Sequence, residues 1–476
     1  MQRHVLIPLI VACALFMENM DSTVLATSLP AIAADIGENP LSLKLALTSY
    51  LVGLAIFIPI SGWVADKYGS RTIFATAIVV FLGGSIACAV SGSLLFFVIA
   101  RFVQGIGGAM MVPVGRLVLL KSVEKSDLIA ALNYLTIPAL LGPIIGPPLG
   151  GLITQYFNWR GIFLINLPIS ILGIYLVLKH IPNIREETLP KLDFRGFVIL
   201  GSGLSFLMLG LSSLGGHLLP GATVAASIVL GAVALELYRR HAKRTVAPVV
   251  DLRLLSIRTF RTGTVGGSLF RIGMGATPLL MPLMFQLGFG LDPFHSGLIT
   301  CSSAIGAMFM KTLTVRVMRQ YGFRQVLVVN ALISSAAVAL YGAFTASTPL
   351  LIVVPILVVT GCMRSLQFTA LNAITFAEIS KEAMSAASSL QSMTQRLAQS
   401  LGVAIGAYAL ELSSQVQGHA NIVASDFWPA FLLVALIAVT SVFYNTSLPR
   451  DAGAEIAGRK KPLMDKTPPV PPEGEA

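Results

Sequence analysis

Long apolar runs alternate with short polar connections along almost all of the 476 residues of this chain. A helix needs about 20 predominantly apolar residues to cross a bilayer, so each run predicts one membrane-spanning helix. The pattern predicts fourteen such helices, and the expected fold class is therefore all-α, a polytopic membrane protein. The expected spans are 5–26, 44–65, 72–90, 94–117, 129–154, 162–178, 197–214, 222–238, 262–286, 297–317, 326–344, 350–375, 385–412 and 427–443.

The composition agrees with this pattern. Only 12% of the residues are charged and the mean hydropathy is +0.80, whereas soluble domains carry about 25% charged residues. The net charge of +11 comes from lysines and arginines that gather in the loops on one side of the predicted bundle. Positive loops face the cytoplasm, so we expect both termini in the cytoplasm. The partner of this basic chain is then the lipid bilayer and not a nucleic acid.

A weak internal sequence repeat divides the chain. The segment 62–71, which follows the second predicted helix, is similar to the segment 315–324, which follows the tenth. Parallel repeats with a substrate site between them are typical of transporters. We expect a six-helix bundle at 1–180, a linker with two inserted helices and a basic cytoplasmic loop at 181–257, a second six-helix bundle at 258–446, and a disordered, proline-rich cytoplasmic tail at 447–476.

Two carboxylates, Glu18 and Asp21, lie three residues apart in the first apolar run, and Arg101 lies in the fourth. A charge near the middle of a bilayer costs at least about 2.5 kcal/mol, so it is usually retained for function. Asp21 and Arg101 are expected at about the same depth, where an ion pair would lower the cost of both charges. We interpret the three residues as a proton-coupling site; the alternative is a pair that only fixes packing.

Three further arginines, Arg271, Arg364 and Arg396, fall inside predicted spans of the second half, which has no acid at a similar depth. Because arginine stays protonated, each must find Glu18 or Asp21 across the midline, helix carbonyls, or an anionic group of a substrate. We predict that they line a polar substrate cavity. We also place the flexible side chains of Met20 and Met281 there; ordinary core filling is the alternative.

The loop after the second predicted helix reads Gly-x-x-x-Asp66-Lys67-x-Gly69-x-Arg71. Its glycines permit a tight turn, and its charged side chains can contact a neighbouring helix end in one conformation only. The expected role is a conformational gate; the alternative is an ordinary short basic loop.

The fifth predicted helix contains Gly142, Pro143, Gly146, Gly150 and Gly151. Prolines bend a helix, and glycines let a neighbouring helix approach closely. We expect this segment to take part in conformational change, although a bent packing helix would also explain it.

The loop signature and the Gly-Pro-rich helix resemble those of the major facilitator superfamily and, within it, the fourteen-helix family of drug:proton antiporters, including its EmrB-like branch. This resemblance implies a monomeric exporter in the bacterial inner membrane that exchanges protons for small amphipathic toxic compounds, without a cofactor. Glu18 departs from the family pattern, in which this position is usually uncharged.

Three alternatives stay open at this point. The same fold could export an endogenous metabolite, lipid-like molecule or siderophore, or the protein could be a non-transporting membrane sensor. A periplasmic adaptor could also join the exporter. An enzyme is not expected, because the sequence shows no nucleophile-base pair, metal-ligand spacing or phosphate-binding loop.

Overall fold

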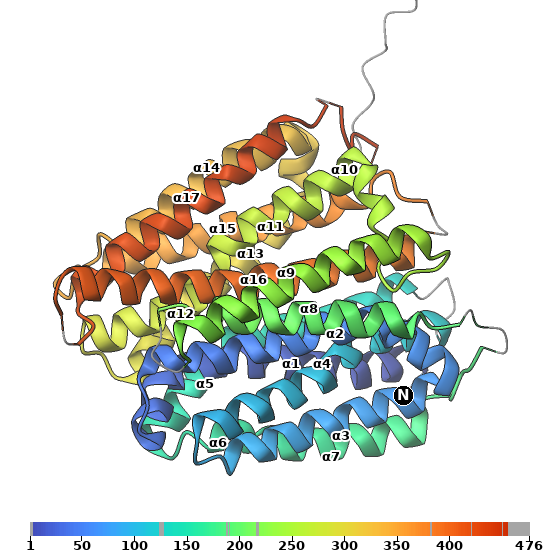
Figure 1. Ribbon diagram of the computed structural model, residues 1–476, viewed down its shortest axis with the longest axis horizontal. Helices are drawn as coiled ribbons and strands as arrows, with labels where there is room; N and C mark the ends of the chain where they lie inside the picture. The colour runs from blue at the N-terminus through green and yellow to red at the C-terminus, as the bar shows by residue number, and fades with distance from the viewer. Residues whose placement is uncertain are drawn as a thin grey trace, which may run out of the picture.

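The computed structural model describes residues 3–122, 128–186, 189, 191–215, 219–380, 383–419, 421–449 and 451–455, and these contain helices and no strands (Figure 1). Twelve helical segments of this part of the chain are long and apolar enough to cross a membrane. The helices α5 and α16, of 29 and 33 residues, are long enough as well and run alongside them. The expected all-α, polytopic membrane class is therefore confirmed.

The first half contains the helices up to residue 180. They are α1 (Arg3–Ile36), α2 (Lys44–Tyr68), α3 (Ser70–Ala89), α4 (Leu94–Ser122), α5 (Leu128–Tyr156), and the consecutive pieces α6 (Gly161–Leu164) and α7 (Asn166–His180). The inserted pair is α8 (Phe194–Ser212) and α9 (Gly221–Arg244). Several helices are longer than the predicted spans. The helix α1 ends at Ile36, ten residues after the predicted end at residue 26.

The second half begins with a broken helix where the sequence predicted a continuous one. This span consists of α10 (Arg258–Arg261), a π-helical turn at Thr262–Gly266, α11 (Gly267–Gly275), α12 (Thr277–Leu283) and a second π-helical turn at Met284–Gly288. Interruptions of this kind often accompany functional sites. The remaining helices are α13 (Pro293–Tyr321), α14 (Phe323–Tyr341), α15 (Leu350–Thr375), α16 (Met384–Val416) and α17 (Phe427–Thr446).

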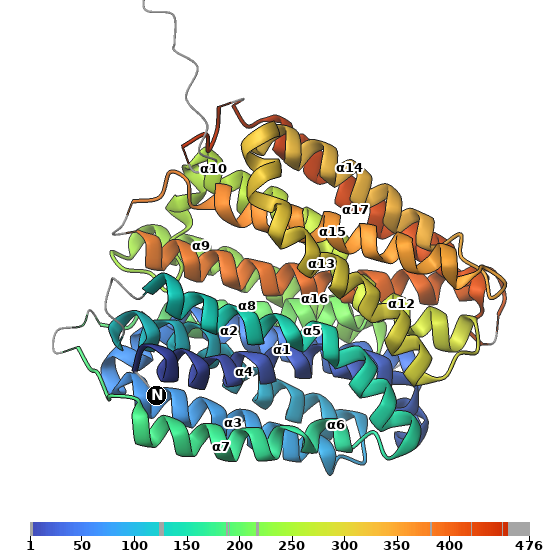
Figure 2. The ribbon, with the colours of Figure 1, turned by 180° about the vertical axis from the view of Figure 1, so that it is seen from behind.

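The two halves meet along two equivalent interfaces. The second helix of each half packs against the fifth of the other, α2 against α16 and α5 against α13. Figure 1 shows the α2–α16 side, and Figure 2 shows α5 and α13 on the opposite face. The repeat extends to the turns, because Gly69 and Gly322 both link a second helix to a third with positive φ, 101° and 76°. The internal repeat predicted from the sequence is thus visible in the packing.

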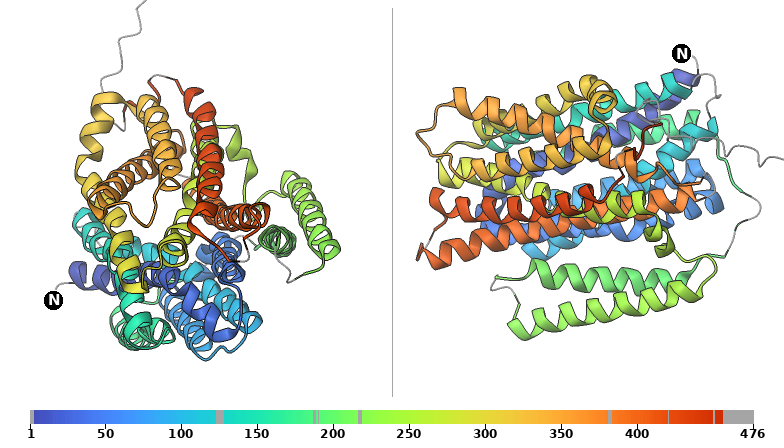
Figure 3. Two further views of the ribbon diagram at one scale, coloured as in Figure 1. Left: turned by 90° about the vertical axis from the view of Figure 1, so that its left-hand side faces the viewer. Right: turned by 90° about the horizontal axis from the view of Figure 1, so that it is seen from above.

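The inserted helices α8 and α9 pack against each other on the outside of the bundle (Figure 3). Only α8 makes extensive contact with the rest of the described chain, through α2 and α16. The pair therefore covers one of the two interfaces between the halves. The boundaries expected for it, residues 181 and 257, remain predictions.

The segment after α17 falls where the sequence predicted a disordered tail. Leu448 is buried, and a Cβ added at Gly453 would lie 2.6 Å from Cδ2 of Phe323. These residues lie against the second half, and the expected boundary of the tail at residue 447 remains a prediction. Residues 456–476 lie outside the described residues.

The halves converge at the end of the bundle that lies opposite the N-terminus. There Gln286 donates from Nε2 to the carbonyl oxygen of Thr27 at 2.9 Å, and Lys44 Nζ lies 3.4 Å from Glu411 Oε2. At the other end, where the N-terminus and α10 lie, the bundle is wider (Figure 1). The halves are therefore held together at the end opposite the N-terminus, here called the closed end.

Candidate functional site

The centre of the first half holds a buried ion pair. Asp21 Oδ2 accepts a hydrogen bond from Arg101 Nη1 at 2.7 Å, and the two side chains are 1% and 0% exposed. Two amides complete the carboxylate shell, because Gln104 Nε2 and Asn166 Nδ2 donate to Asp21 Oδ1 at 2.9 and 3.2 Å. The same amides donate to Ser85 Oγ at 2.7 and 3.0 Å. The ion pair expected from helix depths is therefore present.

Four helices hold this pair in place. Asp21 comes from α1, Ser85 from α3, and Asn166 from the first residue of α7. Arg101 and Gln104 lie one turn apart on the same face of α4, and Arg101 Nη1 also donates to Gln104 Oε1 at 2.6 Å. The network satisfies the carboxylate of Asp21, whereas only Nη1 of Arg101 is bonded, because Nε and Nη2 are buried without a hydrogen-bond partner among the described residues. A buried charge pair is tolerated best when such further hydrogen bonds are made.

Tyr50 of α2 connects this pair to the second carboxylate. Its ring lies 4.5 Å from the guanidinium carbon of Arg101, and its hydroxyl donates to Glu18 Oε1 at 3.4 Å. Glu18 itself lies 3.0 Å from Nη2 of Arg396, which belongs to α16 in the other half. Asp21 and Glu18 therefore have separate arginine partners, and the Glu18 pair bridges the two halves.

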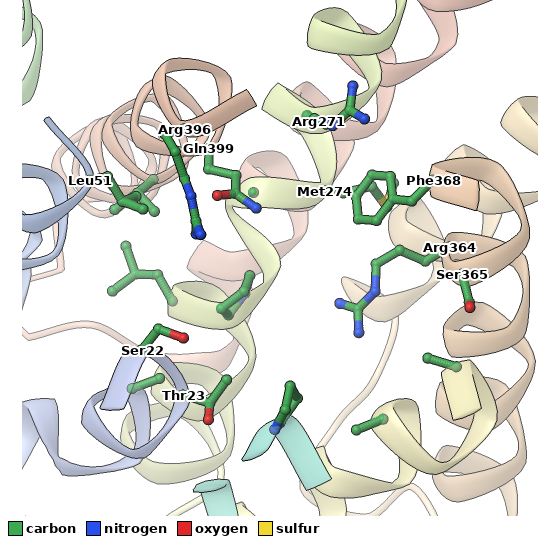
Figure 4. Close-up of a pocket in the computed structure, with 18 of the residues that line it drawn as sticks. Ser22, Thr23, Leu51, Arg271, Met274, Arg364, Ser365, Phe368, Arg396 and Gln399 are labelled. Carbon is green, nitrogen blue, oxygen red and sulfur yellow. The ribbon is translucent and has the colours of Figure 1, made fainter. Parts of the chain in front are cut away.

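A cavity of about 430 Å³ lies between the halves next to these pairs (Figure 4). Its size lies in the range of small-molecule sites, about 300–1,000 Å³. Arg101 and Tyr50 form part of its wall, whereas Asp21 and Glu18 lie behind them. A ligand in the cavity would thus contact the arginine that pairs with Asp21 without contacting the carboxylate.

All three arginines expected in the second half line this cavity. Arg271 Nη2 donates to Asn372 Oδ1 at 2.9 Å, and Arg364 Nη2 donates to Ser303 Oγ at 3.1 Å. Arg396, by contrast, pairs with Glu18. Of these three arginines, only Arg396 therefore pairs with a carboxylate of the other half, which was one of the partners considered from the sequence.

The methionine expectations were only partly right. Met20 is 2% exposed and its backbone packs against α5, so within the described chain it belongs to the core and not to a cavity wall. Met281 lines a second, smaller cavity of about 150 Å³, which shares Arg364 with the larger one. The larger cavity is lined instead by Met308, one of the other methionines that recur in the sequence, and by Met274, which the sequence did not single out.

The glycines of α5 form a contact face against α1. A Cβ added at Gly142 would lie 2.9 Å from the backbone nitrogen of Met20, and one at Gly150 would lie 2.4 Å from the carbonyl oxygen of Val24. A Cβ at Gly146 would collide with Thr23. No side chain fits these positions without moving the α1 backbone or Thr23, so the two helices pack as closely as the sequence suggested.

Two other residues of this segment face the second half. A Cβ at Gly151 would lie 2.2 Å from the carbonyl oxygen of Pro293 in α13, and Pro143 lines both cavities. The helix α5 therefore lies between α1, the cavity and the opposite half. Its part in conformational change stays a prediction.

The predicted gate loop packs against the segment that follows α7. The backbone N–H of Glu186 donates to the carbonyl oxygen of Asp66 at 3.0 Å, and a Cβ at Gly69 would overlap Asn183. Lys67 Nζ lies 4.6 Å from the ring centre of Trp63. Arg71 is the second residue of α3, beside this turn. The gating role of the loop is not tested by these contacts and remains a prediction.

Several functional candidates were missed from the sequence because they carry no charge. Tyr50, Gln104 and Asn166 are neutral polar residues inside apolar runs, and only the spacing of Gln104, one helical turn after Arg101, offered a signal.

Lys311 is a fourth cation of the second half at the cavity wall. The described residues contain no group of three His, Cys, Asp or Glu that could hold a metal.

Comparisons with known proteins agree with this architecture. Residues 11–402 and 263–470 match the sequence profile of the Major Facilitator Superfamily. The chain is 38% identical over 451 residues to the "Putative multidrug resistance protein MdtD" of Escherichia coli K12, with 94% of this chain and 95% of the relative aligned. The same identity and coverage hold for the protein of that name from Shigella boydii.

Solved transporter structures share the fold. A D-xylose-proton symporter superposes with a TM-score of 0.67 at 13% identity, covering 94% of this chain and 98% of its own. A POT family transporter in complex with a thioalcohol-conjugated peptide gives 0.68 at 15% identity, covering 92% and 94%. At these identities the likeness concerns the fold alone.

Proposed function

The chain belongs to the major facilitator superfamily, and we propose that it is a proton-coupled exporter of amphipathic toxic compounds in the inner membrane of a bacterium. It would work as a monomer by alternating access, with both termini in the cytoplasm. The relatives named for multidrug resistance support the export of toxic compounds, and the proton is assigned from the site.

The observation that carries the proposal is the Asp21–Arg101 pair, buried at the wall of the central cavity. A carboxylate in this position can take up one proton at Oδ1 or Oδ2, which leaves the charge of Arg101 without its counter-ion. Protonation therefore changes the electrostatics of the cavity wall although Asp21 itself is 3% exposed. In this proposal, protonation of Asp21 changes the electrostatic potential at the cavity wall and so couples the proton to ligand binding.

Glu18 would transmit protonation to the movement of the halves. In its ionised form it bridges α1 and α16 through Arg396 at 3.0 Å; a proton on Glu18 would remove the ionic part of that bridge. The empty carrier would then rock between its two states only when protonated, and proton release at the cytoplasmic side would restore both ion pairs. Requiring the proton for the empty return converts a proton gradient into export.

Everted membrane vesicles test the proposal directly. A panel of amphipathic drugs is offered to vesicles containing the protein, and uptake is driven by an imposed pH gradient. We expect uptake of at least one drug that collapses when the gradient is dissipated. Drug susceptibility of a deletion strain, set beside a profile of its medium, distinguishes a drug exporter from an exporter of an endogenous metabolite. Gradient-independent uptake of every transported compound would refute the proton coupling.

A further inference from the structure

Five cationic side chains line the central cavity, and no carboxylate of the described residues does. Two of these cations, Arg101 and Arg396, already have carboxylate partners. The other three are Arg271, Lys311 and Arg364, which come from α11, α13 and α15 of the second half. The charge of the cavity is therefore unbalanced, and the imbalance lies on one side.

The contacts of the arginines in this group are neutral. Arg271 is 3% exposed, and it donates to the amide oxygen of Asn372 and lies with its guanidinium carbon 5.3 Å from the ring centre of Phe368. Arg364 donates to the hydroxyl of Ser303. Within the described chain, no carboxylate lies within ion-pair distance of either arginine. Amides, hydroxyls and rings lower the cost of a buried cation, but only an anion neutralises it.

Arg364 is placed to bind that anion. It lines both cavities, and its guanidinium points into the open space between the helices, with Arg396 and Gln399 pointing into the same space from the opposite wall (Figure 4). A guanidinium binds carboxylate and phosphate oxygens in a bidentate geometry that an ammonium cannot offer. Ser365 beside it adds a hydroxyl at the wall.

Much of the rest of the wall is apolar. Leu47, Met274, Leu279, Phe368 and Val403 surround the space next to these cations. Flexible thioethers and an aromatic ring accept apolar bodies of varied shape. A molecule that fits this wall has an apolar body and an anionic head.

We propose that the substrate of this cavity is an amphipathic organic anion, whose carboxylate or phosphate group is bound by Arg364 in the field of Arg271 and Lys311. The inference rests on the proposed transport function and specifies its substrate class. A cationic compound of the same size would be repelled by Arg271, Lys311 and Arg364, and no acid lines the described wall to neutralise it.

The placement also links the substrate to the bridge between the halves. An anion that reaches from Arg364 toward Arg396 competes with Glu18 for the same guanidinium. Either a proton on Glu18 or an anion on Arg396 then weakens the one ion pair that joins α1 to α16. The loaded carrier and the protonated carrier can therefore both move, whereas the empty, ionised carrier stays locked, as exchange requires.

Three fluorescent probes with one apolar body test the charge preference. Dansylglycine is an anion, its methyl ester is neutral, and dansylcadaverine is a cation. They are titrated against the full-length protein in detergent. We expect dansylglycine to bind at least about tenfold more tightly than its ester, because only its carboxylate can form charged hydrogen bonds with Arg364. Dansylcadaverine should bind most weakly.

Variants assign the effect to the cavity. Arg364→Gln should lose about tenfold in dansylglycine affinity with little change for the ester, and Arg364→Lys should retain part of it. Arg195→Gln removes an exposed arginine of the linker and should change nothing. If Arg364→Gln does not fold by gel filtration, Lys311→Gln reports on the same field at a more exposed position, with a smaller loss for dansylglycine expected.

Equal or tighter binding of the ester or of the cation would overturn the proposal, and so would the failure of all three probes to bind. Proton-driven export of dansylcadaverine would then still support the proposed function. Conversely, selective dansylglycine binding without proton-driven transport would leave the anion site standing and remove the proton coupling. The two conclusions therefore fail separately.

Discussion

Glu18 and Arg396 are separated by 378 positions in the chain, yet their side chains form an ion pair of 3.0 Å between the two halves of the bundle. Glu18 is 1% exposed in its side chain and Arg396 is 24% exposed. The pair is thus asymmetric: the carboxylate is sealed in the protein, whereas the guanidinium reaches it from the cavity wall.

This asymmetry predicts unequal effects of removing either partner. Arg396→Gln leaves a buried carboxylate without its cation and should cost about 3–5 kcal/mol. Glu18→Gln leaves a partly exposed arginine and should cost less. The double variant should lie closer to the wild type than Arg396→Gln does, when thermal unfolding is followed in detergent.

The exposed pair of Arg240 with Glu236 supplies the control, because breaking a surface pair should leave the unfolding temperature almost unchanged. Strict additivity of the two substitutions at Glu18 and Arg396 would show that the pair contributes no coupling energy.

We expect Gln104 to position the carboxylate of Asp21, a role that can be tested separately from the Asp21–Arg101 ion pair. Its amide joins Asp21 to Ser85, so Gln104→Leu would leave buried polar atoms with one partner fewer, at about 1–3 kcal/mol. We expect slower proton-driven transport, restored in part by Gln104→Asn. Gln415→Leu, which replaces an exposed amide near the end of α16 outside this network, is the control. A larger transport defect in the control than in Gln104→Leu would contradict this assignment.

The contact of α5 with α1 predicts opposite outcomes for two glycines. Gly150→Ala would place a methyl group 2.4 Å from the carbonyl oxygen of Val24, which is backbone and must move. We expect a clear loss of thermal stability and of transport. Gly83→Ala in α3 meets nothing within 4 Å and should be neutral or stabilise the helix by up to about 1 kcal/mol. Equal tolerance of the two substitutions would refute the close packing.

The pair of Lys44 with Glu411 predicts how the closed end of the bundle can be loosened. Lys44 is 2% exposed and is held by Glu411 and by the carbonyl oxygen of Leu214. Lys44→Met should therefore favour opening at this end. A cysteine placed at Thr27, which is fully buried there, should react faster with a membrane-impermeant maleimide in a background without native cysteines.

The matched control for this experiment is Arg160→Gln, because Arg160 pairs with Asp35 at the same end but within one half. This variant should leave the labelling rate of the Thr27 cysteine unchanged. An unchanged rate in Lys44→Met would show that the pair does not keep the end closed.

Much of the fold follows from patterns of short range. Apolar runs of bilayer length predict the helices, and the repeated turn predicts the two halves, whose Gly69 and Gly322 adopt the same unusual backbone. The pair of Asp21 with Arg101 was also predictable, because depth can be counted along two helices that both cross the bilayer.

The rest of the site depends on long-range packing. The partner of Arg396 is fixed by how α2 and α16 meet, and the sequence left three choices open. Met20 was misplaced because the rotation of α1 about its axis, and not its composition, decides which residues face the cavity. Tyr50 and Asn166 carry no charge, so no cost of burial singled them out.

The most direct test of proton coupling is Asp21→Asn, reconstituted in liposomes with a compound that the wild type exports. Two rates are measured on the same preparation: uptake driven by an imposed pH gradient, and exchange of labelled for unlabelled compound without a gradient. Asp35→Asn, an exposed acid of the same helix, is the control. We expect Asp21→Asn to retain exchange and to lose gradient-driven uptake to the level of protein-free liposomes, whereas undiminished gradient-driven uptake would remove Asp21 from proton coupling.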